Sequence, residues 1–308
     1  MTECERFIKE GLFTPDFFKP EVRCDFLVTT ERKKLWAIQM DLYLKLAQVC
    51  ERHGLRYFAF TGTLLGAARH NGFVPWDDDV DIVMPRADYE RLVAFEEEFQ
   101  HPYFLQVPGR DGEYSFSYMK VRNSRTAQVS RPFMHHKFNQ GVQIDIFPLD
   151  RWDYEEGRAA YARINELNID NSNYMRQGYP NPDESMLSRM KAWSGRSARE
   201  NLREIYTLST QFNVTKSLEW FTCPSCTIYP YERFVFKYEW IHSIVRVPFE
   251  SIQMQIPSFY NEILSVNYGD WHKFPPVESR GEWHGNESFD PDRSYKDVAD
   301  ELLQKSVA

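Results

Sequence analysis

The sequence predicts an α+β protein in which a mixed β-sheet core, flanked by helices, carries a mainly helical insertion. Three observations support this fold class. Residues 30–52 have the apolar spacing of an amphipathic helix, short apolar or alternating segments follow up to residue 147, and residues 153–220 look mainly helical. Because the chain has no internal repeat and no low-complexity linker, we expect a single mixed core with an insertion rather than an array of repeats.

Four regions follow from this pattern. We expect residues 1–28 to form an N-terminal arm and residues 29–150 to form the sheet-containing core. Residues 151–220 form the helical insertion, and residues 221–308 form a C-terminal region that completes the site. Gly54 is a plausible stop for the helix at 30–52. The other predicted core elements are strands at Tyr57–Phe60, Asp79–Met84, Phe104–Val107, Tyr114–Arg122 and Val142–Phe147, and a helix at Arg86–Phe99.

Composition limits the class of protein. Hydrophobic residues make up 42% of the 308 residues, which is enough for a sizeable core. The net charge of −8 argues against a nucleic-acid partner held by charge. The N-terminus lacks a secretory signal, and no apolar run approaches the ~18 residues of a membrane span. We expect a cytoplasmic protein with no transmembrane segment, and peripheral association with a membrane face stays open.

The five cysteines are an odd, scattered set, which is not the pattern of a disulfide framework. Cys223 and Cys226 form a C-x-x-C pair, which supplies half of a zinc site. No second C-x-x-C accompanies it, so partly buried free thiols are the preferred interpretation.

A run of acidic residues from Asp77 to Asp81 is the strongest chemical signal. On a strand, Asp79 and Asp81 project to the same face, while Val80 and Ile82 are free to be buried. Two neighbouring carboxylates repel each other, and a divalent cation relieves that repulsion. Oxygen ligands without nearby Cys or His favour Mg²⁺ or Mn²⁺. The alternatives are an exposed acidic turn or edge strand and a Ca²⁺ site.

A third carboxylate lies on a separate predicted strand. Asp145 stands between Ile144 and Ile146, where an acidic side chain is costly unless it is paired or bound to a metal. It is a candidate metal ligand or general base. The alternatives are an ion pair with an arginine or a loop cap. Asp150 is expected to be a surface or turn residue.

A glycine turn precedes the acidic run. Gly62 and Gly66 bracket Thr63, after one predicted strand and before a short helix that ends near His70. Glycine lets the backbone approach a phosphate closely, and the start of a helix offers unpaired N–H groups to an anion. The Thr63 hydroxyl is a further donor. A tight turn that serves only packing is an equally good interpretation.

Basic residues supply candidate phosphate contacts. Lys120 and Arg122 share one face of the strand predicted at 114–122, and Arg69 and His70 follow the glycine turn. The alternative for each is a solvated strand edge or a surface role.

Three stretches carry a family resemblance. They are FTGTLLGAARHNGFVPWDDDVDI from Phe60 to Ile82, DIFPLD from Asp145 to Asp150, and YGDW from Tyr268 to Trp271 followed by Pro275-Pro276. Together they resemble the LicD family of phosphotransferases, which includes the fukutin-type proteins. The resemblance implies a nucleotidyltransferase-like fold for the core. It also implies that Gly62 and Thr63 hold phosphate and that Asp79, Asp81 and Asp145 hold a divalent metal.

The resemblance also implies substrates. Family members transfer phosphocholine from CDP-choline, or ribitol phosphate from CDP-ribitol, to a glycan hydroxyl. We therefore expect a CDP-activated alcohol donor, a glycan or lipid-linked glycan acceptor of the lipopolysaccharide or teichoic acid kind, and release of CMP. A choline head group needs aromatic rings around it, and Trp76 is the first candidate. Further candidates are Tyr229, Tyr231, Trp240, Tyr268 and Trp271.

The sequence departs from the family pattern near its end. A His-rich segment is expected after the two prolines, yet only His284 is present there. Two other functions remain open. The first is a nucleotidyltransferase that moves NMP from an NTP and releases pyrophosphate, and the second is a non-catalytic protein that has kept the fold.

Overall fold

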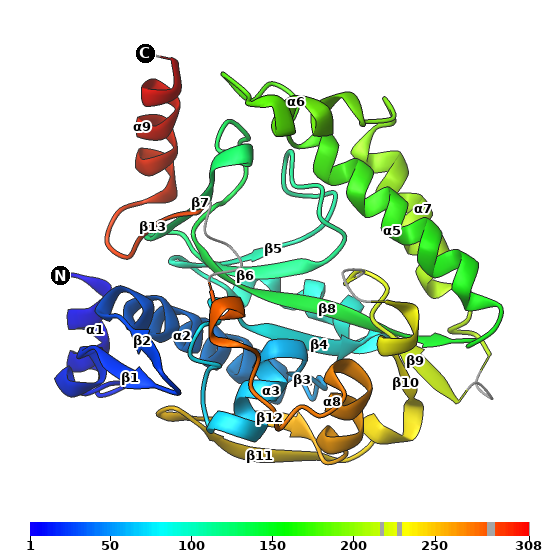
Figure 1. Ribbon diagram of the computed structural model, residues 1–308, viewed down its shortest axis with the longest axis horizontal. Helices are drawn as coiled ribbons and strands as arrows, with labels where there is room; N and C mark the ends of the chain where they lie inside the picture. Colours follow the sequence, from blue (N-terminus) through cyan, green and yellow to red (C-terminus); the bar gives the residue numbers. More distant parts are fainter. Residues whose placement is uncertain (216–218, 227–229, 282–286, 308) are drawn as a thin grey trace.

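A mixed β-sheet forms the centre of the protein, with helices packed around it (Figure 1). The computed structural model describes residues 1–215, 219–226, 230–281 and 287–307. The α+β class predicted from the sequence is confirmed. Within the described residues, no helix is both long enough and apolar enough to cross a lipid bilayer.

Among the described residues, the central sheet has seven strands, in which the long strand β8 (Val142–Trp152) pairs with three others. It runs parallel to β4 (Asp81–Pro85) and antiparallel to β6 (Met119–Asn123) and β9 (Trp220–Thr222). The remaining strands extend the sheet: β3 (Phe58–Ala59) beside β4, β5 (Tyr103–Gln106) beside β6, and β10 (Val235–Lys237) beside β9. Because β4 and β8 are nearly all buried, their apolar residues fix the centre of the core.

Helix α2 (Thr30–Arg52) packs against β6 and β8 and has the bounds that its apolar spacing predicted. The Thr29 hydroxyl caps its first turn by accepting the Arg32 N–H at 3.2 Å. Helix α3 (Thr61–His70) packs against β4 and ends at Asn71, whose φ of 51° is the left-handed conformation common at helix ends. Helix α4 (Arg86–Leu92) packs on β4 and β8.

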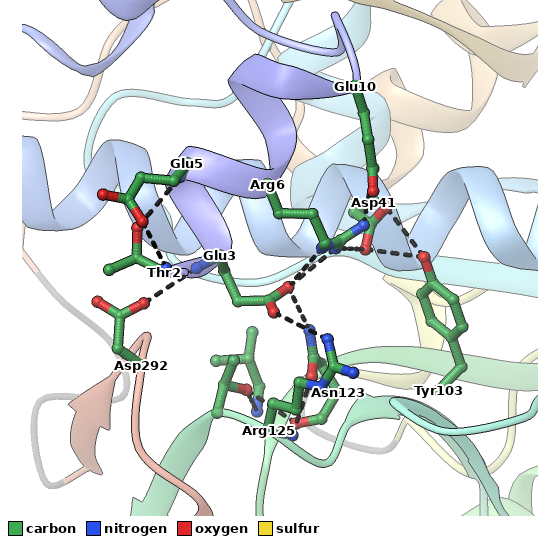
Figure 2. A network of polar contacts seen from close by, with 12 residues as sticks. Thr2, Glu3, Glu5, Arg6, Glu10, Asp41, Tyr103, Asn123, Arg125 and Asp292 are labelled. Atoms are coloured by element: carbon green, nitrogen blue, oxygen red, sulfur yellow. Dashed lines mark hydrogen bonds and ion pairs between the residues drawn. The ribbon is translucent and has the colours of Figure 1, made fainter.

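The N-terminal arm consists of α1 (Glu3–Lys9), a short 3₁₀ turn η1 (Pro15–Phe18) and the hairpin β1–β2 (Glu21–Arg23 and Phe26–Val28). Figure 2 shows how α1 is held on the core. Arg6 lies 2.8 Å from the carboxylates of both Glu3 and Asp41, and Asn123 donates to Glu3 at 3.1 Å. The buried Glu3 and Asp41 carboxylates therefore have charge partners, as buried charges require.

The insertion contains α5 (Gly157–Tyr174), α6 (Glu184–Lys191) and α7 (Ala198–Thr210), and α5 and α7 pack side by side (Figure 1). After β10 the chain forms the hairpin β11–β12 (Ile244–Phe249 and Ile252–Pro257) and α8 (Tyr260–Tyr268), which cover α3. Strand β13 (Glu287–Asp290) then pairs with β7 (Ala127–Ser130), and α9 (Tyr295–Val307) packs against β7.

Some predicted elements have different bounds. Of the strand predicted at 114–122, only the part from Met119 onward is a strand. The helix predicted at 86–99 ends at Leu92 and continues as 3₁₀ turns to Glu98, with a kink at Phe95. The prediction that Asp150 lies on the surface or in a turn was wrong, because it is buried within β8 and pairs with Arg86.

Candidate active site

The first turn of α3 lies against the start of β4. Thr61 opens the helix with a φ of 45°, which is rare for a β-branched residue, and its hydroxyl donates to the Asp81 carboxylate. The Asp81 backbone N–H donates to the Thr63 hydroxyl at 2.8 Å. The glycine turn expected before a helix is therefore the first turn of the helix itself, and its two threonines hold Asp81.

Gly62 leaves room for an acidic side chain. A Cβ built at Gly62 would lie under 3.0 Å from the Asp77 Oδ2 atom, so any side chain there would displace that carboxylate. Gly66 is needed for packing instead, because its Cβ would meet the backbone carbonyl of Gly72. Of the two glycines, only Gly62 bears directly on the acidic residues.

Asp77, Asp78 and Asp79 form a tight acidic turn just before β4. One carboxylate oxygen of each lies within 4.8 Å of the others. Helix α2 holds the backbone of this turn: Trp36 Nε1 donates to the Asp77 carbonyl at 3.1 Å, and Gln39 Nε2 donates to the Asp78 carbonyl at 2.8 Å. Burial raises the pKa of the Asp77 carboxyl well above its usual range, and the charges of Asp79 and Asp78 raise it further.

The argument that Asp79 and Asp81 share a strand face was wrong, because β4 begins at Asp81 and Asp79 lies before it. The structure brings Asp79 together with Asp77 and Asp78 just before the strand. Asp81 has a further neighbour on β8. In the parallel pairing of β4 and β8, Asp81 stands opposite Asp145, so the two carboxylates share one face of the sheet.

Lys120 faces Asp145 from the other side of β8. The antiparallel register of β6 and β8 pairs these two residues, and Lys120 Nζ lies 2.6 Å from Asp145 Oδ1. Lys120 is buried, whereas Asp145 is partly exposed. The row Asp81–Asp145–Lys120 therefore crosses three strands next to the acidic turn.

These residues fit a divalent metal by their chemistry. The acidic turn offers only carboxylate oxygens, which are the ligands that Mg²⁺ and Mn²⁺ prefer. Besides burial, the charges of Asp79 and Asp78 raise the pKa of Asp77, and a cation would relieve this repulsion between the carboxylates. Asp77, Asp78 and Asp79 would hold it most directly, with Asp81 and Asp145 next to them on β4 and β8.

The other predicted phosphate contacts are engaged within the protein. Arg122 is buried and donates to Gln106 Oε1 at 2.6 Å and to the Gly141 carbonyl at 2.9 Å. Arg69 donates to the Trp271 carbonyl at 2.7 Å and so links α3 to the segment after α8. Phosphate binding by Arg122 and Arg69 stays a prediction, whereas Lys120 lies directly beside Asp145.

The aromatic candidates pack into the core. Trp76 is 6% exposed, and its ring contacts Phe26, His70 and Phe274. Tyr231, Trp240, Tyr268 and Trp271 also belong to the main hydrophobic core or pack against it. Tyr229 and His284 lie outside the described residues.

Sequence reasoning missed several residues that the fold brings to the site. Asp77 belongs to the acidic run, but the sequence did not indicate that its carboxylate lies against Gly62 at the start of α3. Tyr118 lies in a segment that was wrongly predicted to be a strand. Burial raises the pKa of its hydroxyl, and the nearby charges of Asp145 and Asp81 raise it further. The Cys223–Cys226 turn is also buried close to Asp81 and Asp145. Burial raises the pKa of the Cys226 thiol, and the charges of these two carboxylates raise it further.

Comparison with known families identifies the class of protein. Residues 54–188 match the family described as LicD/FKTN/FKRP, nucleotidyltransferase domain. This match confirms the family resemblance of the motifs that lie within these residues. The matched region includes the first turn of α3, the acidic turn, Lys120 and Asp145.

Individual relatives extend this similarity. A protein of Haemophilus influenzae named lipopolysaccharide cholinephosphotransferase LicD is 26% identical over 255 residues, which cover 78% of this chain and 91% of that protein. An uncharacterized protein of Rickettsia prowazekii is 36% identical over 106 residues, which cover 34% of this chain and 36% of that protein. The similarity to the Haemophilus protein therefore reaches well beyond the matched domain.

Proposed function

We propose that this protein is a metal-dependent phosphotransferase that moves a phospho-alcohol group of the phosphocholine type from a CDP-activated donor to a glycan hydroxyl. The acidic turn packed against Gly62, at the start of α3, is the observation that carries the proposal. The similarity to a lipopolysaccharide cholinephosphotransferase supports the choice of phosphocholine and of a lipopolysaccharide-type acceptor.

In the proposed reaction, the acceptor oxygen forms a bond to the transferred phosphorus while the bond from that phosphorus to the CMP oxygen breaks. A bound Mg²⁺ or Mn²⁺ would neutralise the donor diphosphate. N–H groups in the first turn of α3 would bind phosphate oxygens, and the contacts of Thr61 and Thr63 with Asp81, which fix that turn, support this role. Lys120, which lies beside Asp145, would supply a cation for a phosphate oxygen or for the departing CMP.

Asp145 has two compatible roles. As a general base it would take the proton of the acceptor hydroxyl as the new bond to phosphorus forms. As a metal ligand it would complete the carboxylate set begun by the acidic turn. Its partial exposure suits the first role, because an acceptor must reach it from solvent.

A product assay tests the proposal. The purified chain is incubated with CDP-choline, Mg²⁺ and a lipopolysaccharide acceptor, and the nucleotide products are separated. Release of CMP with incorporation of phosphocholine is the expected result, and chelation of the metal should stop it. Wild-type rates in Asp79→Ala or Asp81→Ala would contradict the site assignment.

The same assay tests the alternative chemistry. The matched domain is described as a nucleotidyltransferase domain, which favours nucleotidyl transfer as the second candidate function. Incubation with CTP or ATP and release of pyrophosphate would support that candidate. Binding of neither CDP-alcohols nor nucleoside triphosphates, with or without Mg²⁺, would contradict both enzymatic functions.

A further inference from the structure

Two aromatic rings lie against the ammonium group of Lys120 beside Asp145, and a third ring packs against one of them. Lys120 Nζ lies 5.1 Å from the ring centroid of Tyr118 and 5.4 Å from that of Phe116. The ring of Phe147 lies 4.3 Å from that of Tyr118, and Phe147 follows Asp145 by two residues on β8, so it shares the face of that carboxylate. We call Phe116, Tyr118 and Phe147 the aromatic wall.

The aromatic wall is built to stabilise a cation. The faces of aromatic rings attract positive charge when the cation lies within about 6 Å of the ring centroid. Here two ring faces and one carboxylate act on the same ammonium group, because Lys120 Nζ is also 2.6 Å from Asp145 Oδ1. Phe147 is buried, whereas Phe116 and Tyr118 each expose part of their surface.

The position of Tyr118 is fixed by neighbouring contacts rather than by regular structure. Its backbone carbonyl accepts the Tyr114 hydroxyl at 2.7 Å, and its ring packs on Phe147. Phe116 lies between Tyr114, at a centroid distance of 5.4 Å, and Phe133, at 5.9 Å. A wall held this way is pre-organised, which lowers the entropy that binding would otherwise cost.

We propose that Phe116, Tyr118 and Asp145 form the subsite for a cationic head group of the donor, and that they select a quaternary ammonium over a neutral group of the same shape. This inference rests on the proposed phosphotransferase function. The head group would take the place of Lys120 Nζ, because two cations there would repel each other. The flexible stem of Lys120 then lets its ammonium group turn to the donor phosphates.

A quaternary ammonium suits this subsite for a chemical reason. It has no N–H group and cannot donate a conventional hydrogen bond, so ring faces and a carboxylate are the groups that recognise it best. The ring of Trp76, the candidate predicted from the sequence, is buried and already has the Arg280 guanidinium 5.0 Å from its centroid. The aromatic wall instead borders a carboxylate of the candidate active site.

Calorimetric binding of two matched donors tests the subsite. CDP-choline is compared with CDP-3,3-dimethylbutanol, in which a carbon atom replaces the charged nitrogen, both in the presence of Mg²⁺. We expect the wild-type chain to bind the charged donor about tenfold more tightly, since each ring contributes a modest cation–π attraction. Tyr118→Leu and Phe116→Leu should each lower this ratio to about threefold, because the other ring and Asp145 remain, whereas Tyr118→Phe, which keeps the ring, should preserve it.

Tetramethylammonium binding tests the competition with Lys120. Lys120→Met removes the competing ammonium group and should bind tetramethylammonium more tightly than the wild-type chain does. A purely structural role of the rings predicts no such gain, so equal or weaker binding in Lys120→Met would count against the proposal. Thermal unfolding of each variant serves as the folding control.

The outcomes separate this inference from the proposed function. If the wild-type chain transfers phosphocholine while Tyr118→Leu and Phe116→Leu keep the full preference for the charged donor, the subsite is wrong and the function stands. If the wild-type chain neither transfers phosphocholine nor binds CDP-choline, the proposed function fails and the subsite fails with it.

Discussion

Replacing Gly62 by alanine tests the link between the first turn of α3 and the acidic turn. The added methyl group would lie under 3.0 Å from Asp77 Oδ2, whereas ordinary contacts are 3.4–4 Å. The Asp77 carboxylate must therefore retreat by about 1 Å, and a displacement of that size at a reacting centre costs about 100-fold in rate. We expect phosphotransfer by Gly62→Ala to fall by about two orders of magnitude.

Stability should respond differently from activity. Gly62 lies within α3, where alanine is favoured over glycine by up to about 1 kcal/mol, and the atom that must move is the end of a side chain. The free energy of unfolding should therefore change by no more than about 1 kcal/mol. Gly66→Ala is the matched control, because its methyl group meets the backbone of Gly72 and should destabilise the fold.

Two measurements decide the outcome. Mn²⁺ binding followed by electron paramagnetic resonance reports the metal site, and denaturant unfolding reports stability. Gly62→Ala should bind Mn²⁺ more weakly while unfolding at nearly the wild-type denaturant concentration. Wild-type Mn²⁺ affinity together with wild-type turnover in this variant would refute the idea that Gly62 makes room for a functional Asp77.

Three further changes have defined expectations. Arg86→Met leaves the fully buried Asp150 carboxylate without its bidentate partner and should cost about 3–5 kcal/mol in denaturant unfolding; a loss below 1 kcal/mol would contradict this. Burial and the Arg69 charge lower the pKa of His70 to about 4. The unfolded chain therefore binds a proton below pH 6.5 that the folded state does not bind, and the free energy of unfolding should fall by up to about 3 kcal/mol from pH 6.5 to 4. The variant His70→Gln should flatten this pH dependence. Asp145→Asn should abolish turnover while the protein still folds, and full activity would exclude the general-base and metal-ligand roles proposed for that carboxylate.

Local patterns were enough to predict much of the fold. The helix at Thr30–Arg52 has the predicted bounds, because its apolar stripe and its end signals are encoded in neighbouring residues. The strand around Asp145 was also predicted, although β8 extends five residues further, to Trp152. Strand β4 was placed two residues too early, because alternating acidic and apolar residues look alike inside a strand and just before one.

The residues that meet at the site depend on how separate elements pair. The sequence by itself determined the α+β class, the family motifs and the presence of an acidic run, since each is a property of contiguous residues. Only the tertiary structure decided that Asp77 faces Gly62, that Lys120 pairs with Asp145, and that Asp150 is buried against Arg86. Periodicity specifies which face of an element is apolar, whereas strand register and helix packing, set by the whole core, decide which side chains from distant segments come into contact.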